Sequence, residues 1–455
     1  MSDRAQSILG ISFDGLTISG IVNEFLNLAS VFRRSGFRVV LDLGFDIRLR
    51  AQEFTDTMLP SWVETIRIIG SDPPRGYVDE VVQDAARLAV AGTNVNAVKA
   101  NDALCSELAA RIASTFDQQS VRFVIVENGT LPDNPLFTEA LYRAISDYGN
   151  RHGFGKYVLW HDHDLMWSAE PHRFGAYPYS GVRKPKANQH VEYSVSTDWM
   201  RKRMQAWSPG LPCHIIPDRF FVPPPETQPR KALRAQYGIP KDAYLIARCT
   251  RVVPQKSIER DLRLLGQLQR RLSKPVFLFI TGPTTEDPAE FEYLRALARK
   301  LFIADQVIWG DGLLPFNRLL GDPAGNAERL HVFDLLAEAD LSSFLTTYDY
   351  EGFGNPPGEA MAARVPFIAT TYELYQDVYG SKGVIAPLLA IDRATSPADP
   401  MPEDFLAWTV RALTDDAYRK QTTAHNLEIC QRFFSLDALE RQVVEIFDIK
   451  VLESQ

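Results

Sequence analysis

Two glutamates stand eight positions apart in the segment "YEGFGNPPGEAM" at 350–361. Glu351 and Glu359 flank a turn rich in glycine and proline, and the glycines leave room for a ligand to approach the backbone. Asn355 followed by Pro356 predicts a helix N-cap with proline at the first helical position, and the free amides of a helix N-terminus favour an anion such as phosphate. Each carboxylate could then accept hydrogen bonds from hydroxyls on one side of the phosphate. The pattern suits a nucleotide sugar, although two solvated acids on a capped surface turn would have the same spacing.

Two cations, Arg251 and Lys256, lie five positions apart in the segment "RCTRVVPQKS". They follow an apolar run that predicts a strand, so we expect both at a strand end, where ligands of α/β sheets bind. Two cations there suit a diphosphate and stabilise its charge as it leaves. A basic pair in a loop is otherwise commonly solvated. We expect the two glutamates at the same end of the same sheet, and this favours a functional role for Arg251 and Lys256.

A third polar group, "HDHD" at 161–164, follows another apolar run. Two histidines and two acids this close suit a metal site on chemical grounds. We nevertheless expect no metal, because consecutive side chains point in different directions and Arg251 and Lys256 supply positive charge. His161 remains a candidate site residue, although a lone histidine after a strand is more commonly structural.

The elements that must position these residues alternate along the chain. Short apolar runs predict strands at 8–13, 37–42, 122–126, 156–160, 191–196, 243–248, 275–281, 306–310, 341–347 and 365–371. Helical spacing of apolar residues predicts helices at 20–34, 257–272, 288–302 and 327–339. Continuous apolar strands that alternate with helices imply α/β domains with doubly wound parallel sheets.

Composition bounds the class of protein. A chain of 455 residues suggests two or three domains. The proline-rich stretch at 222–230 leads us to expect a linker at 223–231, between domains at 1–222 and 232–432. A net charge of −8 argues against a nucleic-acid binder. Dispersed cysteines, no apolar run of membrane-spanning length and no signal-peptide pattern lead us to expect a cytoplasmic chain.

The segment "AEADLSSFLTTYDYEGFGNPPGEAMAARVPFIATT" at 337–371 resembles the donor site of retaining GT-B glycosyltransferases of family 4. The resemblance implies that Glu351 contacts the donor sugar and Glu359 the ribose. It implies that backbone amides hold the sugar and the diphosphate at Phe353, Gly354 and Asn355. Two residues depart from the family pattern: Arg364 stands where glycine is usual, and Gly358 where a large aliphatic residue is common.

Further segments extend the resemblance over most of the chain. Arg251 and Lys256 match the cation pair of the family, and His161 matches a histidine beside the donor sugar. "FDGLTISGIVNE" resembles the glycine loop, in which Gly20 would let the backbone approach the diphosphate or the acceptor. A structural glycine at a helix start explains Gly20 equally well. The "DHD" at 162–164 also spells the metal motif of the different GT-A class.

The resemblance implies two Rossmann-like domains facing across a cleft, with a C-terminal helix at 433–455 packing back on the first domain. It implies metal-independent, retaining transfer of a hexose from a UDP-, GDP- or ADP-sugar to a hydroxyl acceptor, with no cofactor and no covalent nucleophile. The leaving phosphate would take the acceptor proton. A sugar-nucleotide epimerase or phosphorylase on the same scaffold, or a non-catalytic nucleotide-sugar-binding protein, are the alternatives.

The acceptor side depends on the stretch at 164–189, which shows little helical or strand periodicity. A loop this long inside a compact domain is commonly functional. Its aromatic and basic residues suit a small anionic acceptor such as a sugar acid or sugar phosphate. The candidate acceptor-binding residues are Trp167, Arg173, Tyr177 and Arg183. A solvated loop that caps the domain has the same composition, and a lipid acceptor at a membrane surface, which we do not favour, also fits it.

Overall fold

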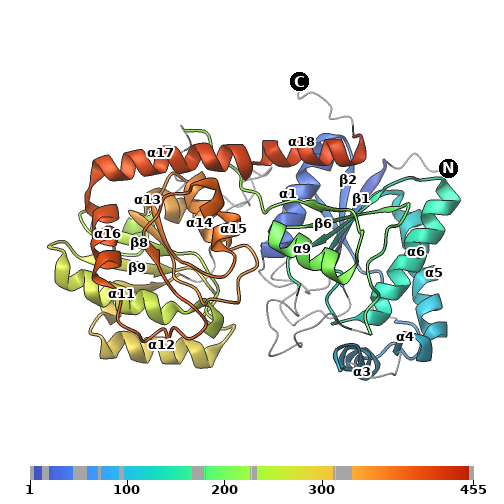
Figure 1. Ribbon diagram of the computed structural model, residues 1–455, viewed down its shortest axis with the longest axis horizontal. Coiled ribbons are helices and arrows are strands. Elements are labelled where there is room, and N and C mark those ends of the chain that lie inside the picture. Colours follow the sequence, from blue (N-terminus) through green and yellow to red (C-terminus); the bar gives the residue numbers. More distant parts are fainter. Residues whose placement is uncertain are drawn as a thin grey trace. The chain divides into compact units, whose positions relative to one another are not determined.

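The computed structural model divides into two compact units (Figure 1). Unit 1 comprises Met1–Asp218 and Leu439–Gln455, and unit 2 comprises Arg219–Ala438. The residues that the structure describes are 5–12, 20–44, 59–69, 73–91, 97–165, 179, 181–225, 227, 233–310, 313 and 330–449. No helix within these ranges is long and apolar enough to cross a membrane.

Among the described residues, unit 1 contains a seven-stranded sheet in the order β3-β2-β1-β4-β5-β6-β7. All neighbouring strands pair in parallel. The strands are β1 (Ser7–Ser12), β2 (Arg38–Asp42), β3 (Val63–Ile66), β4 (Val121–Glu127), β5 (Val158–Asp162), β6 (Val191–Val195) and β7 (Cys213–Ile215). The strand order reverses between β1 and β4, and ligands of such sheets bind at this switch point.

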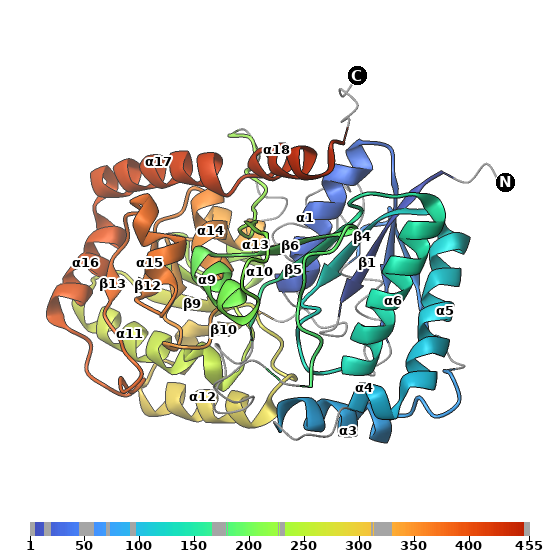
Figure 2. The ribbon, with the colours of Figure 1, turned by 45° about the vertical axis from the view of Figure 1, so that its right-hand side comes forward.

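Helices cover both faces of the sheet of unit 1 (Figure 2). Phe32 of α1 and Phe447 of α18 pack against Phe123 of β4, with ring centroids 5.1 and 5.5 Å away. On the opposite face, Tyr142 of α6 stacks on Trp160 of β5 at 4.4 Å. In the described ranges, the helices of this unit are α1 (Gly20–Arg34), α3 (Asp79–Val90), α4 (Ala97–Ala100), α5 (Asp102–Gln119), α6 (Pro135–His152) and α9 (Asp198–Trp207), joined by most of α18 (Leu436–Phe447). The C-terminal helix therefore returns to the first domain.

Unit 2 repeats this architecture with a parallel sheet that has six strands in the described ranges, in the order β10-β9-β8-β11-β12-β13. The strands are β8 (Tyr244–Arg248), β9 (Val276–Ile280), β10 (Val307–Trp309), β11 (Leu341–Phe344), β12 (Phe367–Thr370) and β13 (Leu388–Leu389). The switch point of this sheet lies between β8 and β11.

The helices of unit 2 pack their apolar sides on this sheet. For example, Leu262 and Leu265 of α11 join Ile246 of β8 and Leu278 of β9 in one buried cluster. The helices are α10 (Leu233–Gln236), α11 (Ile258–Arg271), α12 (Pro288–Lys300), α13 (Val332–Glu338), α14 (Asn355–Ala362), α15 (Tyr375–Val378), α16 (Glu403–Thr414) and α17 (Asp416–Phe433). Helix α14 begins at Asn355 and is preceded by Gly354, so Gly354 stands at the cap position that the sequence analysis gave to Asn355.

Candidate functional site

Two of the predicted site residues meet at the switch point of unit 2. Lys256 closes a short turn (Pro254–Lys256) after β8, and Glu351 follows the neighbouring strand β11. Lys256 Nζ donates to Glu351 Oε1 at 2.7 Å, and Thr346 Oγ1 donates to the same oxygen at 2.7 Å. Only 15% of the Lys256 side chain and 8% of the Glu351 side chain are exposed. The fold thus joins a cation and a carboxylate that lie 95 positions apart in the chain.

A buried arginine, which the sequence analysis missed, holds the loop that carries Lys256. Arg248, the last residue of β8, is fully buried and pairs with Asp261 of α11 at 3.3 Å. Its guanidinium also donates to the carbonyl oxygens of Ser343, at 3.1 Å, and of Lys256. A buried charge is stable only when it is paired and hydrogen-bonded, and the ion pair with these two bonds supplies most of that compensation, although Arg248 Nε itself makes no hydrogen bond. They also tie the Lys256 turn to strand β11.

Helix α14 presents two acceptors that lack partners within the described chain. The Oδ1 atom of Asn355 is buried without a hydrogen bond. Glu359, a little over one turn further along, is partly exposed, and burial of its carboxylate raises its pKa to about 8. Among the described residues no side chain forms an ion pair with Glu359, and only the burial acts on its pKa. Unsatisfied acceptors at a helix start are groups that hydroxyls of a ligand can satisfy.

The turn between the two glutamates is fixed by buried tyrosines. Tyr372 Oη donates to Phe353 O at 2.5 Å, and Tyr379 Oη donates to Gly354 O at 2.7 Å. Gly354 has a φ of +85°, and a Cβ there would lie 2.6 Å from Tyr372 Oη. Both the backbone conformation and the lack of space therefore require glycine.

The two departures from the family pattern are accommodated by one neighbouring segment. A Cβ on Gly358 would lie 2.0 Å from the ring of Phe220, so this ring occupies the space that a larger side chain at 358 would take. Arg364 adopts a φ of +62°, in the left-handed region that favours glycine. Its guanidinium donates to Pro223 O at 2.9 Å, so it contributes a tether that glycine could not.

Arg251 lies at the same edge of the sheet, but it binds a carboxylate that the sequence analysis did not single out. Its Nε atom donates to both Glu286 oxygens, at 2.8 and 3.0 Å. A Cβ on Gly282 would lie 2.3 Å from Thr250 O, which shows how closely the loops after β8 and β9 approach. About a third of the Arg251 side chain is exposed.

The remaining predicted site residues belong to unit 1. His161 of β5 is buried, and its Nδ1 lies 2.8 Å from Ser194 Oγ. Gly20 is the first residue of α1. Arg183 donates to Glu139 Oε2 at 3.0 Å and lies over the ring of Tyr142. Three other predicted acceptor residues fall outside the described residues: Trp167, Arg173 and Tyr177.

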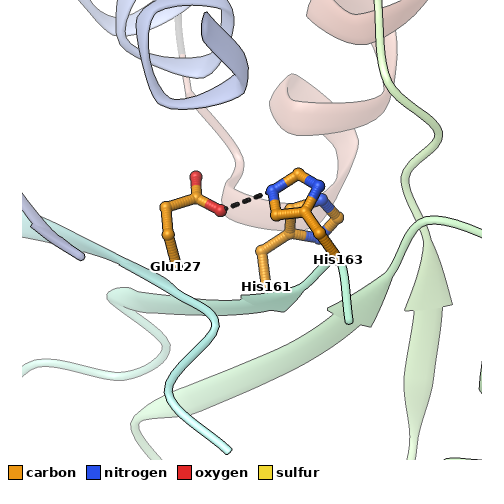
Figure 3. A group of neighbouring side chains, drawn as sticks. All are labelled: Glu127, His161 and His163. Carbon is orange, nitrogen blue, oxygen red and sulfur yellow. Dashed lines mark hydrogen bonds and ion pairs between the residues drawn. The ribbon is translucent and has the colours of Figure 1, made fainter. Parts of the chain in front are cut away.

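The "DHD" segment contributes His163 to a buried network with Glu127 and His161 (Figure 3), and Asp162 takes no part in it. His163 lies between two carboxylates, with Nε2 2.8 Å from Glu127 Oε2 and Nδ1 3.3 Å from Asp218 Oδ1. Burial disfavours the charged ring, but the hydrogen bonds to Asp218 and Glu127 outweigh it and raise the pKa of His163 well above its usual value. Asp162 points elsewhere, since its Oδ1 accepts from the amide and the hydroxyl of Thr130 at 3.1 and 2.8 Å.

Glu127 and Asp218 escaped the sequence analysis. Glu127 ends the apolar run "VRFVIV", and an acid at that point was the available signal. Asp218 lies in "HIIPDRF", a segment that carries no chemical pattern of its own.

At the level of sequence, no family model and no curated protein matches the chain. Solved structures do. A glycosyltransferase from Rickettsia africae matches over the full length of both chains, with a TM-score of 0.62 and 13% identity. The chain has a GT-B fold. A sucrose-phosphate synthase from Thermosynechococcus elongatus matches over 97% of this chain and 98% of its own, with a TM-score of 0.62 and 16% identity. Anabaena HepE, solved with UDP, matches over 97% and 100%, with a TM-score of 0.58 and 15% identity.

Proposed function

We propose that the protein is a retaining glycosyltransferase that moves a hexose from a nucleotide diphosphate sugar to a hydroxyl acceptor. The observation that carries the proposal is the Lys256–Glu351 ion pair at the switch point of a GT-B sheet, together with Glu359 of α14, which has no ion-pair partner among the described residues. The resemblance of 337–371 to a family 4 donor site supports the same residues. The UDP complex of HepE makes a uridine nucleotide the first donor to test.

Each donor group has a partner in this proposal. Lys256 turns from Glu351 to the diphosphate, which frees Glu351 to accept hydrogen bonds from the sugar hydroxyls. Glu359 accepts from the ribose hydroxyls, and backbone amides of the turn around Gly354 hold the phosphates. The resemblance to family 4 also proposes His161 as a contact to the donor sugar.

Catalysis then rests on charge rather than on a covalent nucleophile. As the bond between sugar and phosphate breaks, negative charge grows on the diphosphate, and the cations Lys256 and Arg251 stabilise it. The leaving phosphate takes the proton of the acceptor hydroxyl on the same face of the sugar.

Because the protein supplies the positive charge, we expect transfer to survive treatment with EDTA, measured as product formed per minute before and after chelation. A lost rate that Mg²⁺ restores would contradict this metal independence.

The first experiment is a binding screen with UDP-glucose, GDP-mannose and ADP-glucose by thermal unfolding. A ligand at 100 times its Kd stabilises the fold by about 2.7 kcal/mol, which is a readily measured shift. With the donor that binds, product is then followed with and without candidate acceptors, and the anomeric configuration is read by NMR. Acceptor-dependent product with retained configuration supports the proposal. Turnover of the donor to an epimer without acceptor, or binding without any turnover, would overturn it.

A further inference from the structure

Three buried side chains of unit 1 converge in a way that the transfer reaction does not need. Glu127, His161 and His163 turn toward one another at the carboxyl ends of β4 and β5 (Figure 3). One candidate ligand atom from each lies within 4.8 Å of the others, and all three residues are buried. We propose that these side chains bind a divalent transition metal of the zinc class, and that the bound ion inhibits sugar transfer by engaging His161. The inhibitory effect rests on the proposed function, whereas the binding of the ion does not.

The strand register explains why these three residues meet. Glu127 and His161 are direct partners in the parallel pairing of β4 and β5. Side chains two residues apart point to the same side of extended chain, so His163 returns to the side of His161. Asp162 points to the opposite side, where Thr130 holds it. The site is therefore built from alternate residues of one segment and a neighbouring strand, and not from the consecutive acids of "DHD".

Both histidines are held by a second partner, as metal-bound histidines are. Nδ1 of His161 lies 2.8 Å from Ser194 Oγ, and Nδ1 of His163 lies 3.3 Å from Asp218 Oδ1. A partner of this kind on the other ring nitrogen fixes the tautomer and the orientation of a metal-bound imidazole. In His163 the remaining nitrogen, Nε2, is the one that faces Glu127 Oε2 at 2.8 Å.

The charge of the cluster also suits a cation. Glu127 is 1% exposed, and its Oε1 has no hydrogen bond. A buried carboxylate needs a compensating positive charge, and a cation held between Glu127 and the two imidazoles would supply one. Two imidazoles and one carboxylate form a zinc ligand set, with bonds of about 2.0–2.2 Å that need side-chain shifts of about 1 Å here.

Direct binding of Zn²⁺ to chelator-stripped protein tests the site. Zn²⁺ is titrated against a chromophoric chelator, and visible absorption of bound Co²⁺ reports the ligand geometry. We expect one ion per chain, and at least about tenfold weaker binding in Glu127→Gln and in His163→Gln. Ser194→Ala keeps all three ligands and removes only the outer partner of His161, so it should weaken binding by about tenfold without a large packing change.

The matched control is His214→Gln. His214 Nε2 lies 3.0 Å from Glu192 Oε2, so it forms a histidine–glutamate pair that no second histidine joins among the described residues, and 38% of its side chain is exposed. This variant should bind Zn²⁺ as the wild type does. No one-to-one binding in the wild type, or the same affinity in every ligand variant, would overturn the site, and so would an equal loss in His214→Gln.

The transfer assay tests the inhibitory role separately. Zn²⁺ should inhibit over the concentrations at which it binds, EDTA should restore the rate, and Ser194→Ala should need about tenfold more Zn²⁺. Binding without inhibition would overturn the inhibitory role, and so would a chelated enzyme that requires Zn²⁺ for turnover. If no donor and acceptor give product, the proposed function fails while the binding result stands by itself.

Discussion

The two sheets of the molecule end in switch points that treat their polar groups in opposite ways. In unit 2, Lys256 and Glu351 pair with each other, while Glu359 and Asn355 keep acceptors without partners in the described chain. In unit 1, His163 lies between two carboxylates, and every member of that network is buried. The same strand order thus produces one edge suited to receive a hydroxyl-rich ligand and one edge whose charges pair mainly with one another, although Glu127 Oε1 there also makes no hydrogen bond.

This difference separates residues that act on a ligand from residues that stabilise the fold. Removing one partner of a buried ion pair leaves a buried charge uncompensated, and the fold loses stability. Removing an acceptor that has no partner breaks no hydrogen bond of the folded state, so the stability is kept and only the affinity for the ligand falls. Substitutions in the network of unit 1 should therefore mainly lower stability, and substitution of Glu359 in unit 2 should mainly lower ligand binding, whereas Glu351 is paired with Lys256 and its loss should lower both.

The largest effect is expected at the buried edge of unit 1. Glu127→Ala removes the 2.8 Å partner of His163 and leaves the buried imidazolium and Asp218 imperfectly paired. We expect a loss of about 3–5 kcal/mol in the free energy of unfolding, measured by urea denaturation in buffer with EDTA.

Asp117→Ala is the matched control for Glu127→Ala. Asp117 pairs with His152 at 3.0 Å, but both side chains are about 40% exposed. An exposed pair contributes about 0–1 kcal/mol, so this variant should unfold almost as the wild type does. Equal losses in the two variants would show that burial does not set the strength of the Glu127–His163 pair.

The second effect concerns the donor edge of unit 2. Glu351→Ala should lower the transfer rate by about 100-fold, a barrier increase of about 2.7 kcal/mol, while the chain stays folded. The physical reason is the lost contact to the donor sugar together with a Lys256 that no longer has its partner. Steady-state kinetics and a thermal unfolding curve check the two halves of this prediction.

A glutamate at the opposite end of the same strand serves as the control for Glu351. Glu338 precedes β11 and accepts hydrogen bonds from the amides of Leu233 and Arg234 at 2.8 and 2.9 Å. Glu338→Ala should cost stability and leave the turnover of the folded protein unchanged. Near-normal transfer by Glu351→Ala would show that the donor site has been placed at the wrong edge.

The sequence predicts the central strands of both sheets well, because strands buried on both faces are continuous apolar runs. It misses the edge strands β3, β7 and β13, which span only Val63–Ile66, Cys213–Ile215 and Leu388–Leu389. These segments are short and partly exposed, so they carry neither a long apolar run nor a clear alternation. An edge strand forms because a neighbour offers it hydrogen bonds, and that information lies outside the segment.

The candidate site divides in the same way. Glu351 and Glu359 share one segment, so their spacing was visible, whereas the partner of each cation depends on which strands become neighbours. Glu286, for example, reaches Arg251 from the loop after β9. Glu127 meets His163 only through the register of β4 and β5. Residue types can therefore be read from the sequence, but pairings across strands require the fold.

A smaller effect is the pH dependence of donor binding. The pKa of Glu359 is about 8 in the fold, above its ordinary value of 4.5, so the carboxyl is largely protonated at pH 6. Ribose hydroxyls donate to the ionised form, so the affinity for the bound nucleotide sugar should rise about tenfold from pH 6 to pH 8. Isothermal titration calorimetry at both pH values measures this change.

Glu359→Gln should remove most of that pH dependence. The raised pKa of Glu359 also makes the stability of the wild type depend on pH. The protonated carboxyl contributes stability that is fully present below pH 4.5 and is lost as the pH rises through 8, whereas glutamine does not titrate. The variant should therefore gain stability relative to the wild type between pH 6 and pH 9, measured by thermal unfolding. A wild-type affinity that does not change with pH would contradict the assignment of Glu359 to the ribose.

The smallest effect is expected on the acceptor side, where the arginines of the 164–189 stretch are proposed to bind an anionic acceptor. Arg173→Ala and Arg183→Ala should each raise the acceptor KM about fivefold, a loss of about 1 kcal/mol, and leave donor binding unchanged.

Arg183 already pairs with Glu139 at 3.0 Å, so its substitution also removes a partner of Glu139. Arg143 binds the same carboxylate at 2.9 Å from helix α6 and lies outside the stretch, which makes Arg143→Ala the matched control. A raised acceptor KM in Arg183→Ala but not in Arg143→Ala would assign the effect to the acceptor, because the two variants share the loss at Glu139. Unchanged acceptor kinetics in Arg173→Ala and Arg183→Ala, or strong activity only with lipid vesicles, would defeat the proposal of a small anionic acceptor.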